Sequence, residues 1–294
     1  MIVYMKYLVL RLKKNLKING GQRMYKLIAI DMDGTLLRDD KTITTLNKKT
    51  LRKAIELGVK VVLTSGRPIQ GLKKYLDELE LTGEDDYVIG VNGALVCKTS
   101  DYSVINSNGT LTGKDLKYIY NKVKDLETYV HAFTNKEDLV NIESRFSDEE
   151  EKRIDLKVRV VDFLNEVQDE DEILKVVLEG EKVVLDKITP QIPKELFEKY
   201  TVIRSLDFMV EFMNKNCNKS IGLEKLAQYL KISKEEIIAI GDADNDIEMI
   251  EYAGLGVAMG NAKDEIKNIA NFVTKSNEED GVAYVIDKFI VNNN

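Results

Sequence analysis

Four short apolar runs that each end directly on polar residues place the strongest constraint on how this chain folds. They are Leu27–Ile30, Val59–Leu63, Tyr87–Val91 and Ile237–Ile240. Each run is almost continuously hydrophobic, which is typical of strands that are buried on both faces of a parallel sheet. Segments with helical periodicity lie between them, at residues 45–57, 220–230, 247–252 and 266–270. This alternation predicts a doubly wound α/β domain built on a parallel sheet.

The polar residues that follow the four runs are expected to gather at one edge of this sheet. These segments are Asp31–Thr35, Thr64–Arg67, Asn92–Gly93 and Gly241–Asp246. Open α/β sheets bind their ligands at the carboxyl ends of the strands. We therefore expect the functional site where these four segments meet.

The middle of the chain, from about Ser107 to about Leu206, has a different pattern. Helical and strand-like segments alternate irregularly there, and no polar cluster follows the strands. We predict an α+β domain, residues 107–206, inserted into a core domain that comprises residues 24–106 and 207–294. Residues 1–23, which carry the basic run Arg11–Lys14, are interpreted as an appendage outside the fold, with an amphipathic surface segment as the alternative.

Composition excludes several classes of function. The net charge of -7 gives no sign of a nucleic-acid surface, and no apolar run is long enough to cross a membrane. Cys97 and Cys217 are far apart in apolar surroundings, which is typical of reduced thiols in a cytoplasmic protein. The single histidine, His131, lies in the insert, which excludes a histidine metal cluster and a Ser-His-Asp triad in the core domain.

Asp31 and Asp33 place two carboxylates at the end of a buried strand. Residues two apart on a strand face the same side, so both carboxylates can address one site. Desolvating them is costly unless a cation or hydrogen-bond donors compensate, and a hard cation such as Mg2+ readily takes carboxylate oxygens. A polar turn would explain Gly34 and Thr35, but it does not require two acids. The segment therefore indicates a metal site with a carboxylate left for chemistry.

A calcium-binding EF-hand loop is excluded for both acidic segments. Such a loop requires glycine at its sixth position and glutamate at its twelfth. Counted from Asp31 these positions hold Leu36 and Thr42, and counted from Asp242 they hold Ile247 and Ala253.

The second acidic segment, Gly241–Asp246, lies between a strand and a helix. Acidic residues commonly cap helix N-termini, and this explains a solvent-exposed Asp244. Capping does not require Asp242, which directly follows the strand, and we assign Asp242 to the metal. Asn245 is placed to donate to a phosphate, and Asp246 is placed to orient a lysine.

Thr64-Ser65-Gly66-Arg67 has the composition of an anion site. A hydroxyl group and backbone N–H groups after a buried strand can bind phosphate oxygens, although a simple helix cap is the alternative. Lys219, which precedes the helical segment 220–230, could neutralise phosphate charge, but alone it would be interpreted as a surface lysine.

Taken in order, these segments resemble the haloacid dehalogenase superfamily of phosphotransferases. The four matching motifs are Asp31–Thr35, Ser65 in Thr-Ser-Gly-Arg, Lys219, and Gly241-Asp242 with Asn245-Asp246. The large insert, preceded by Asn92-Gly93-Ala94, resembles the Cof-type branch with a C2 cap. The segments 240–262 and 272–276 resemble the sugar-phosphate phosphatases of that branch. One departure is Ser220, since glycine usually follows the motif lysine.

The resemblance implies a Rossmann-like core, a C2-type α+β cap and a Mg2+-dependent phosphatase that acts on small phosphorylated metabolites, chiefly sugar phosphates. Asp31 would attack phosphorus and form an aspartyl-phosphate, and Asp33 would protonate the leaving alkoxide and then activate water. An oxygen of Asp31, the backbone carbonyl of Asp33 and Asp242 would hold the metal. The remaining implied roles are phosphate binding by Ser65, Gly66, Arg67, Lys219 and Asn245, and support by Asp246 and Asn92.

Two other functions stay open at this stage. A phosphomutase of the same fold, similar to phosphomannomutases, would return the phosphoryl group to a sugar, and a non-catalytic protein would only bind the phospho-ligand. Arg204, Glu211 and His131 are candidate substrate contacts, although an ordinary surface or core role is the simpler interpretation of each. We expect a monomer or a weak homodimer.

Overall fold

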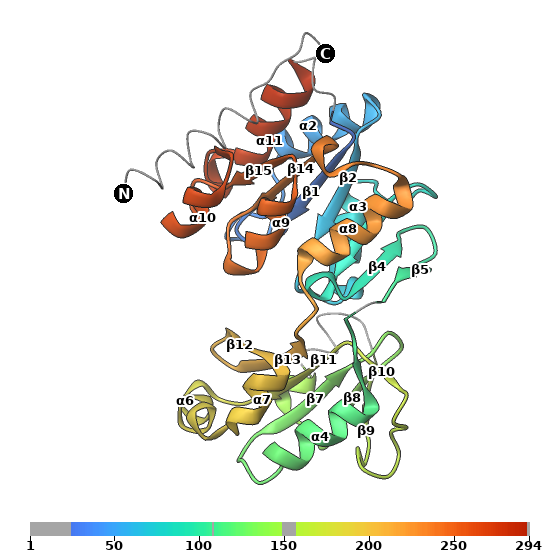
Figure 1. Cartoon of the computed structure of the whole chain (residues 1–294), viewed down its shortest axis with the longest axis vertical. Coiled ribbons are helices and arrows are strands. Elements are labelled where there is room, and N and C mark those ends of the chain that lie inside the picture. The colour runs from blue at the N-terminus through green and yellow to red at the C-terminus, as the bar shows by residue number, and fades with distance from the viewer. Residues whose placement is uncertain (1–24, 108, 149–156, 293–294) are drawn as a thin grey trace.

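The computed structural model describes residues 25–107, 109–148 and 157–292. They form a core domain and a smaller cap domain, which is joined to the core by two connections (Figure 1). The expected appendage, residues 1–23, lies outside the described residues. Among the described residues, no helix has both the length and the apolar character needed to cross a membrane.

The core domain is built on an eight-stranded sheet with the order β16-β15-β14-β1-β2-β3-β4-β5. The six strands from β16 to β3 pair in parallel, whereas β4 and β5 continue the sheet antiparallel. The bounds are β1 Leu27–Asp31, β2 Lys60–Thr64, β3 Tyr87–Gly90, β4 Leu95–Lys98, β5 Val104–Asn106, β14 Ile237–Gly241, β15 Leu255–Ala258 and β16 Phe272–Val273. The predicted doubly wound sheet is confirmed.

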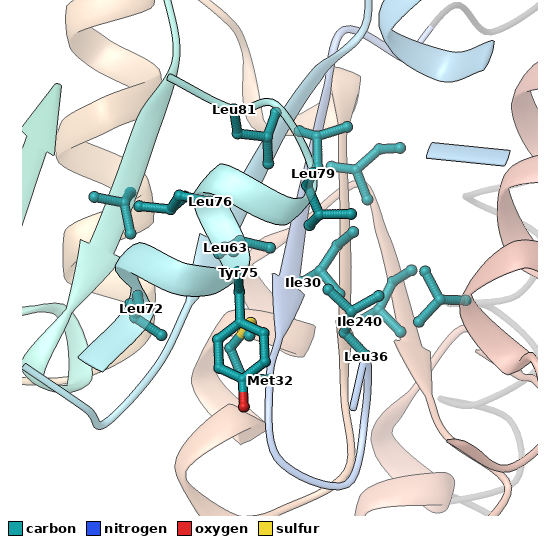
Figure 2. Close-up of a cluster of buried hydrophobic side chains, with 14 of the residues drawn as sticks. Ile30, Met32, Leu36, Leu63, Leu72, Tyr75, Leu76, Leu79, Leu81 and Ile240 are labelled. Carbon is teal, nitrogen blue, oxygen red and sulfur yellow. The ribbon is translucent and has the colours of Figure 1, made fainter. Parts of the chain in front are cut away.

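Both faces of this sheet are apolar because helices cover both of them. On one face, Ile30 and Ile240 pack with Leu63 and with Tyr75 and Leu76 of α3 (Figure 2). On the other face, residues of β1 and β14 pack against α8 and α9. This two-sided burial explains why the strands appear in the sequence as continuous apolar runs.

The helices of the core divide between these two faces. The bounds on the first face are α2 Thr45–Glu56, α3 Lys73–Glu78 and α11 Gly281–Ile286, and those on the second are α8 Lys219–Leu230 and α9 Ile247–Tyr252, with α10 Asp264–Ile269 against α9. The short turns are η1 Ile69–Leu72, η2 Val91–Gly93, η4 Lys234–Glu236, η5 Asp244–Asp246, η6 Asn277–Glu279 and η7 Asp287–Val291.

The cap domain has a six-stranded sheet with the order β12-β13-β11-β7-β8-β9 and a small two-stranded sheet of β6 and β10. Its strands are β6 Leu111–Thr112, β7 Tyr129–Phe133, β8 Asp138–Val140, β9 Val158–Val160, β10 Glu172–Ile173, β11 Lys175–Glu179, β12 Tyr200–Leu206 and β13 Met209–Asn214. Its helices are α4 Gly113–Val123, α6 Lys182–Ile188 and α7 Lys194–Lys199, with the turn η3 Thr189–Gln191.

The predicted boundary between residues 206 and 207 is wrong. It cuts the hairpin of β12 and β13, and β13 also pairs with the central cap strand β11. Strand β13 therefore belongs to the cap, and the chain returns to the core only after Asn214. The hairpin of β12 and β13 is local, but the pairing of β13 with β11 joins segments more than thirty residues apart, which local sequence does not reveal.

Candidate active site

The carboxyl ends of three neighbouring core strands lie side by side. Asp31 ends β1 and is paired in register with Thr64, the last residue of β2. On the other side of β1, Ile30 is in register with Ile240 of β14, which ends at Gly241. The polar segments that follow these strands therefore meet at one edge, as the sequence predicted.

A buried lysine links two of the predicted carboxylates. Lys219 Nζ lies 2.5 Å from Asp31 Oδ1 and 2.6 Å from Asp246 Oδ1, and its side chain is 1% exposed. Lys219 is the first residue of α8, whose N-terminus is capped by the Asn218 side chain. The second oxygen of Asp246 accepts hydrogen bonds from the backbone N–H groups of Asp242 and Ala243. Asp246 thus fixes Lys219 against Asp31.

Burial dominates the electrostatics of this cluster. It raises the pKa of Asp31 to about 8, and the nearby charge of Asp246 adds to the rise while Lys219 opposes it. Burial alone would lower the pKa of Lys219, but Asp246 and Asp31 outweigh it and raise that pKa above its ordinary value. Carboxylates that cost this much to ionise together are typical of sites that bind a cation.

Asp242 is held directly beside the strand ends. Thr35 Oγ1 donates a hydrogen bond of 2.8 Å to Asp242 Oδ1, and burial raises the pKa of Asp242. Gly34 has a φ of +83°, and a Cβ atom there would lie 2.4 Å from Asp242 Oδ2. Only glycine satisfies both requirements at position 34, so Gly34 and Thr35 are both explained by the position of Asp242.

The carboxylates can hold a metal ion. Single carboxylate oxygens of Asp31, Asp242 and Asp246 all lie within 4.8 Å of one another. An all-oxygen, buried donor set suits a hard divalent cation. Because both oxygens of Asp246 already accept hydrogen bonds from the chain, Asp31 and Asp242 are the better placed of the three. They are also two of the three residues that the sequence assigned to the metal.

Asp33 points its carboxylate to a different partner. Arg67 donates to both oxygens, over 2.8 Å from Nε and 2.6 Å from Nη2, and Lys41 Nζ lies 2.8 Å from Oδ1. Burial would raise the pKa of Asp33, but hydrogen bonds and charges from Arg67 and Lys41 outweigh it and lower the pKa. The sequence gave no reason to select Lys41, which is one of 43 lysines and arginines.

The loop that follows β2 is rigidly supported. Ser65 is buried, and its Oγ accepts a hydrogen bond from the backbone N–H of Arg67. The turn η2 forms two backbone hydrogen bonds with this loop. Val91 N donates to Arg67 O, and Asn92 N donates to Ser65 O. Gly66 lies against the Asn92 side chain, which leaves little space for a larger residue.

Turn η2 joins the remaining predicted residues. Asn245 Nδ2 donates to Asn92 Oδ1 over 2.9 Å. Val91 and Asn92 both have a positive φ, of 51° and 52°, a conformation that is strongly disfavoured for a β-branched residue. Such backbone strain is often found at functional sites. Asn92 therefore connects the loop after β2 with the loop after β14.

The three candidate substrate contacts in the cap have different surroundings. Arg204 Nη1 lies 2.6 Å from Asp186 of α6, and the guanidinium also binds backbone carbonyls of the cap, as expected of an ordinary surface residue. Glu211 forms a buried ion pair with Lys175, and His131 lies between Asp138 and Glu179. Asp244 is exposed, as predicted, and it pairs with Lys263.

A cavity of about 300 Å³ lies where the core meets the cap. Its walls come from η1, which begins two residues after Arg67, from the β4–β5 hairpin, and from Asn135 of the cap. The catalytic candidates do not line it.

Comparison with known proteins decides the family. Residues 28–286 match the family described as haloacid dehalogenase-like hydrolase. The chain belongs to this family. The resemblance that the sequence motifs indicated, including the Cof-type branch, is confirmed, and this haloacid dehalogenase-like hydrolase is an enzyme of the phosphatase class.

Relatives of this hydrolase match it over almost their whole length. It is 42% identical over 276 residues to a Bacillus subtilis protein named "Putative phosphatase YxeH", covering 91% of this chain and 99% of the relative. It is 31% identical over 277 residues to the 5-amino-6-(5-phospho-D-ribitylamino)uracil phosphatase YitU of the same organism, with 90% and 97% covered. A haloacid dehalogenase-like hydrolase from Bacteroides thetaiotaomicron has a similar structure, with a TM-score of 0.79, 29% identity, and 90% and 99% covered.

Proposed function

We propose that this phosphatase is Mg2+-dependent and hydrolyses small phosphorylated metabolites, chiefly sugar phosphates, through an aspartyl-phosphate. The observation that carries the proposal is the buried contact of Lys219 with Asp31 and Asp246, beside Asp242 and the loop at Ser65. This arrangement offers a nucleophile, a fixed cation and phosphate donors at one point, and phosphoryl transfer depends mainly on positioning and charge neutralisation.

In the first half-reaction, an oxygen of Asp31 attacks phosphorus while the bond to the leaving oxygen breaks. Asp33 gives its proton to that oxygen, so an alcohol departs and Asp31 carries the phosphoryl group. In the second half-reaction, Asp33 takes a proton from water, which attacks phosphorus and restores Asp31 as phosphate leaves. Arg67 and Lys41 bind Asp33 in this structure and lower its pKa, so they must release that carboxylate, and it must take up a proton from solvent, before Asp33 can protonate the leaving oxygen.

The remaining residues hold the phosphoryl oxygens. We assign this role to Ser65, the backbone of Gly66, Arg67, Lys219 and Asn245. Mg2+ would be held by an oxygen of Asp31, the backbone carbonyl of Asp33 and Asp242, and when bound it offsets the charge that otherwise repels a carboxylate from a phosphate. Asp246 keeps Lys219 in place, and Asn92 supports both Asn245 and the loop at Ser65.

The substrate class rests on the relatives and on the cap. One relative is named for a phosphatase of a ribitylamino-uracil phosphate, which is a polyol phosphate like the sugar phosphates. Residues 25–106 and 215–292 would act as the catalytic core, with the cap between them selecting the leaving group. We also propose a monomer or weak homodimer in the cytoplasm, where the buried, unpaired Cys97 and Cys217 stay reduced.

The test is phosphate release from a panel of sugar phosphates and 5-amino-6-(5-phospho-D-ribitylamino)uracil, with Mg2+ and with chelator. We expect turnover with Mg2+ that Asp31→Asn reduces by about 10⁴-fold or more. Asp244→Asn is the matched control, because Asp244 is exposed and pairs with the exposed Lys263. Substantial hydrolysis by Asp31→Asn would refute the covalent route. Formation of a hexose 6-phosphate from the 1-phosphate would indicate a mutase, and binding without phosphate release would indicate a binding protein.

A further inference from the structure

The two faces of the cap sheet differ in chemistry. On one face, Val130, Ala132, Val176, Leu178 and Phe212 form an apolar core with helices α4, α6 and α7. Successive strand residues point to opposite sides, so the residues between them face away from the helices. Five of these are ionisable and almost completely buried, and we call them the polar face: His131, Asp138, Lys175, Glu179 and Glu211.

An ion pair and an aromatic ring lie at the centre of the polar face. Lys175 Nζ is 2.9 Å from Glu211 Oε1, and the two side chains are 6% and 7% exposed. The pair joins neighbouring strands β11 and β13. Phe133 is directly opposite Lys175 on β7, and the ammonium lies 4.7 Å from the centre of its ring. The pair thus adjoins an apolar, aromatic surface.

The rest of the polar face is a buried row of three groups. His131 Nδ1 lies 3.2 Å from Glu179 Oε1, and Nε2 lies 3.3 Å from Asp138 Oδ2, with all three side chains fully buried. Burying charges is expensive even when they are paired, and apolar residues of similar size would pack at lower cost. The polar face is therefore not explained by packing alone, since the opposite face of the same sheet packs with apolar residues.

The polar face is turned toward the core domain. Phe133, Val177 and Met209, which share this face, belong to the same apolar cluster as Val91 and Leu95 of the core. The Asn92 amide contacts Met213 Sδ over 3.4 Å, and Asn92 also binds Asn245 of the candidate active site.

Met213 connects the strand of the ion pair with the active-site loops. Met213 is two residues from Glu211 on β13 and faces the same side. Glu211 of the pair therefore lies one pleat repeat, roughly 7 Å along β13, from a residue that touches the active-site loops.

Resting on the proposed phosphatase function, we propose that the Lys175–Glu211 pair, with Phe133, binds the hydroxyl groups of a polyol leaving group. An ammonium has three N–H donors and a carboxylate has several acceptor sites, so each keeps bonding capacity beyond their mutual contact. A hydroxyl group needs both a donor and an acceptor, and the Phe133 ring can cover the C–H face of the polyol. Aryl and alkyl alcohols cannot use the pair.

The charge of the polar face narrows the substrate class further. It holds three carboxylates against one lysine and one histidine, so it carries a net negative charge even when the histidine is protonated. A second phosphate on the leaving group would be repelled in this poorly solvated place. Monophosphates of sugars and sugar alcohols therefore fit better than sugar bisphosphates or nucleoside di- and triphosphates.

The experiment compares two kinds of substrate in a double variant. Lys175→Met/Glu211→Leu removes both charges together and leaves neither one buried without a partner. We expect the ratio of kcat/KM for sugar and sugar-alcohol phosphates to kcat/KM for phenyl phosphate to fall roughly 10- to 100-fold, mainly through KM. Lys117→Met is the control, because it breaks an exposed ion pair with Asp169 on the helix-covered side of the cap and should not alter the ratio.

The outcomes separate this inference from the proposed function. Turnover by the wild type with an unchanged ratio in the double variant overturns the inference and leaves the phosphatase function standing. If the wild type releases no phosphate, binding is measured instead by calorimetry in an Asp31→Asn background. The double variant should then weaken binding of a sugar phosphate roughly 10- to 100-fold more than binding of phenyl phosphate. Equal weakening of both ligands shows a purely structural pair and also overturns the inference.

Discussion

At the scale of single residues, the chemistry of the site depends on which partner holds Asp33. Its carboxylate is bound by the forked guanidinium of Arg67 and by the exposed Lys41. Arg67 is only 20% exposed and lies against the ring of Tyr75, whereas the Lys41 side chain is 52% exposed. A bidentate, half-buried contact fixes geometry, while an exposed lysine adds little.

The two cations on Asp33 should therefore differ in mutational effect. We expect Arg67→Met to lower kcat by roughly 100-fold, because the phosphoryl group loses the donor that Arg67 provides once it has released Asp33. Lys41→Met removes one charge from the same carboxylate and is the matched control, with an expected change below about 3-fold. Steady-state kinetics on one sugar phosphate measures both variants. Equal losses in the two would contradict the proposed role of Arg67.

At the scale of elements, the turn η2 lies between the loop that follows β2, which carries Ser65, and the start of helix α8. Gly93 has a φ of +91°, and a Cβ atom there would lie 2.1 Å from Asn218 O. Asn218 caps α8 and directly precedes Lys219. The close approach of η2 to the cap of α8 thus helps to place Lys219 beside Asp31.

Comparing Gly93→Ala with Gly58→Ala should separate the cost of a positive φ from the cost of a steric clash, because only Gly93 of the two has a close backbone neighbour. Gly58 also has a positive φ, of +83°, but a Cβ atom there meets nothing within 4 Å. We expect Gly58→Ala to cost about 1 kcal/mol of unfolding free energy, which is the conformational term alone. Gly93→Ala should cost more and should also reduce activity, because the Asn218–Lys219 backbone must move. Urea unfolding and phosphate release measure the two effects; equal costs without loss of activity would show that the contact is unimportant.

The buried groups His131, Asp138 and Glu179 of the cap sheet predict that the free energy of unfolding depends on pH. Burial favours neutral His131, but hydrogen bonds and charges from Asp138 and Glu179 outweigh it and raise the pKa of His131 to about 9. Because this folded-state pKa lies above the ordinary value of about 6.5, the stabilisation is complete below pH 6.5 and is lost as pH rises through 9.

The pH effect should be measurable as unfolding free energy between pH 6 and pH 10. A shift from 6.5 to about 9 corresponds to a loss of about 3 kcal/mol across this range. His131→Gln should be less stable than the wild type at pH 6 and should lack most of this slope. A variant with the same slope as the wild type would show that other groups cause the loss.

At the scale of the whole molecule, the sequence predicted those features that depend on local pattern or on shared strand ends. Helix α9 has the predicted bounds, and the segments that carry Asp31, Ser65 and Asp242 meet because parallel strands end at one edge. Features that depend on distant pairing were missed. The membership of β13 in the cap sheet is set by its pairing with β11, and Lys41 reaches Asp33 only through a turn in which its φ is +65°.

Metal binding should couple the active site to the stability of the whole molecule. Asp31 is buried and Asp242 is partly buried, and both have raised pKa values, so ionising both in the folded protein is costly without a cation. Mg2+ at 100 times its dissociation constant should stabilise the folded state by about 2.7 kcal/mol and raise Tm, and chelator should reverse the rise. Asp242→Asn removes a proposed ligand and should abolish this Mg2+-dependent rise, whereas Asp244→Asn should retain it. An equal rise in Asp242→Asn would place the bound Mg2+ elsewhere and contradict the assignment of Asp242 to the metal.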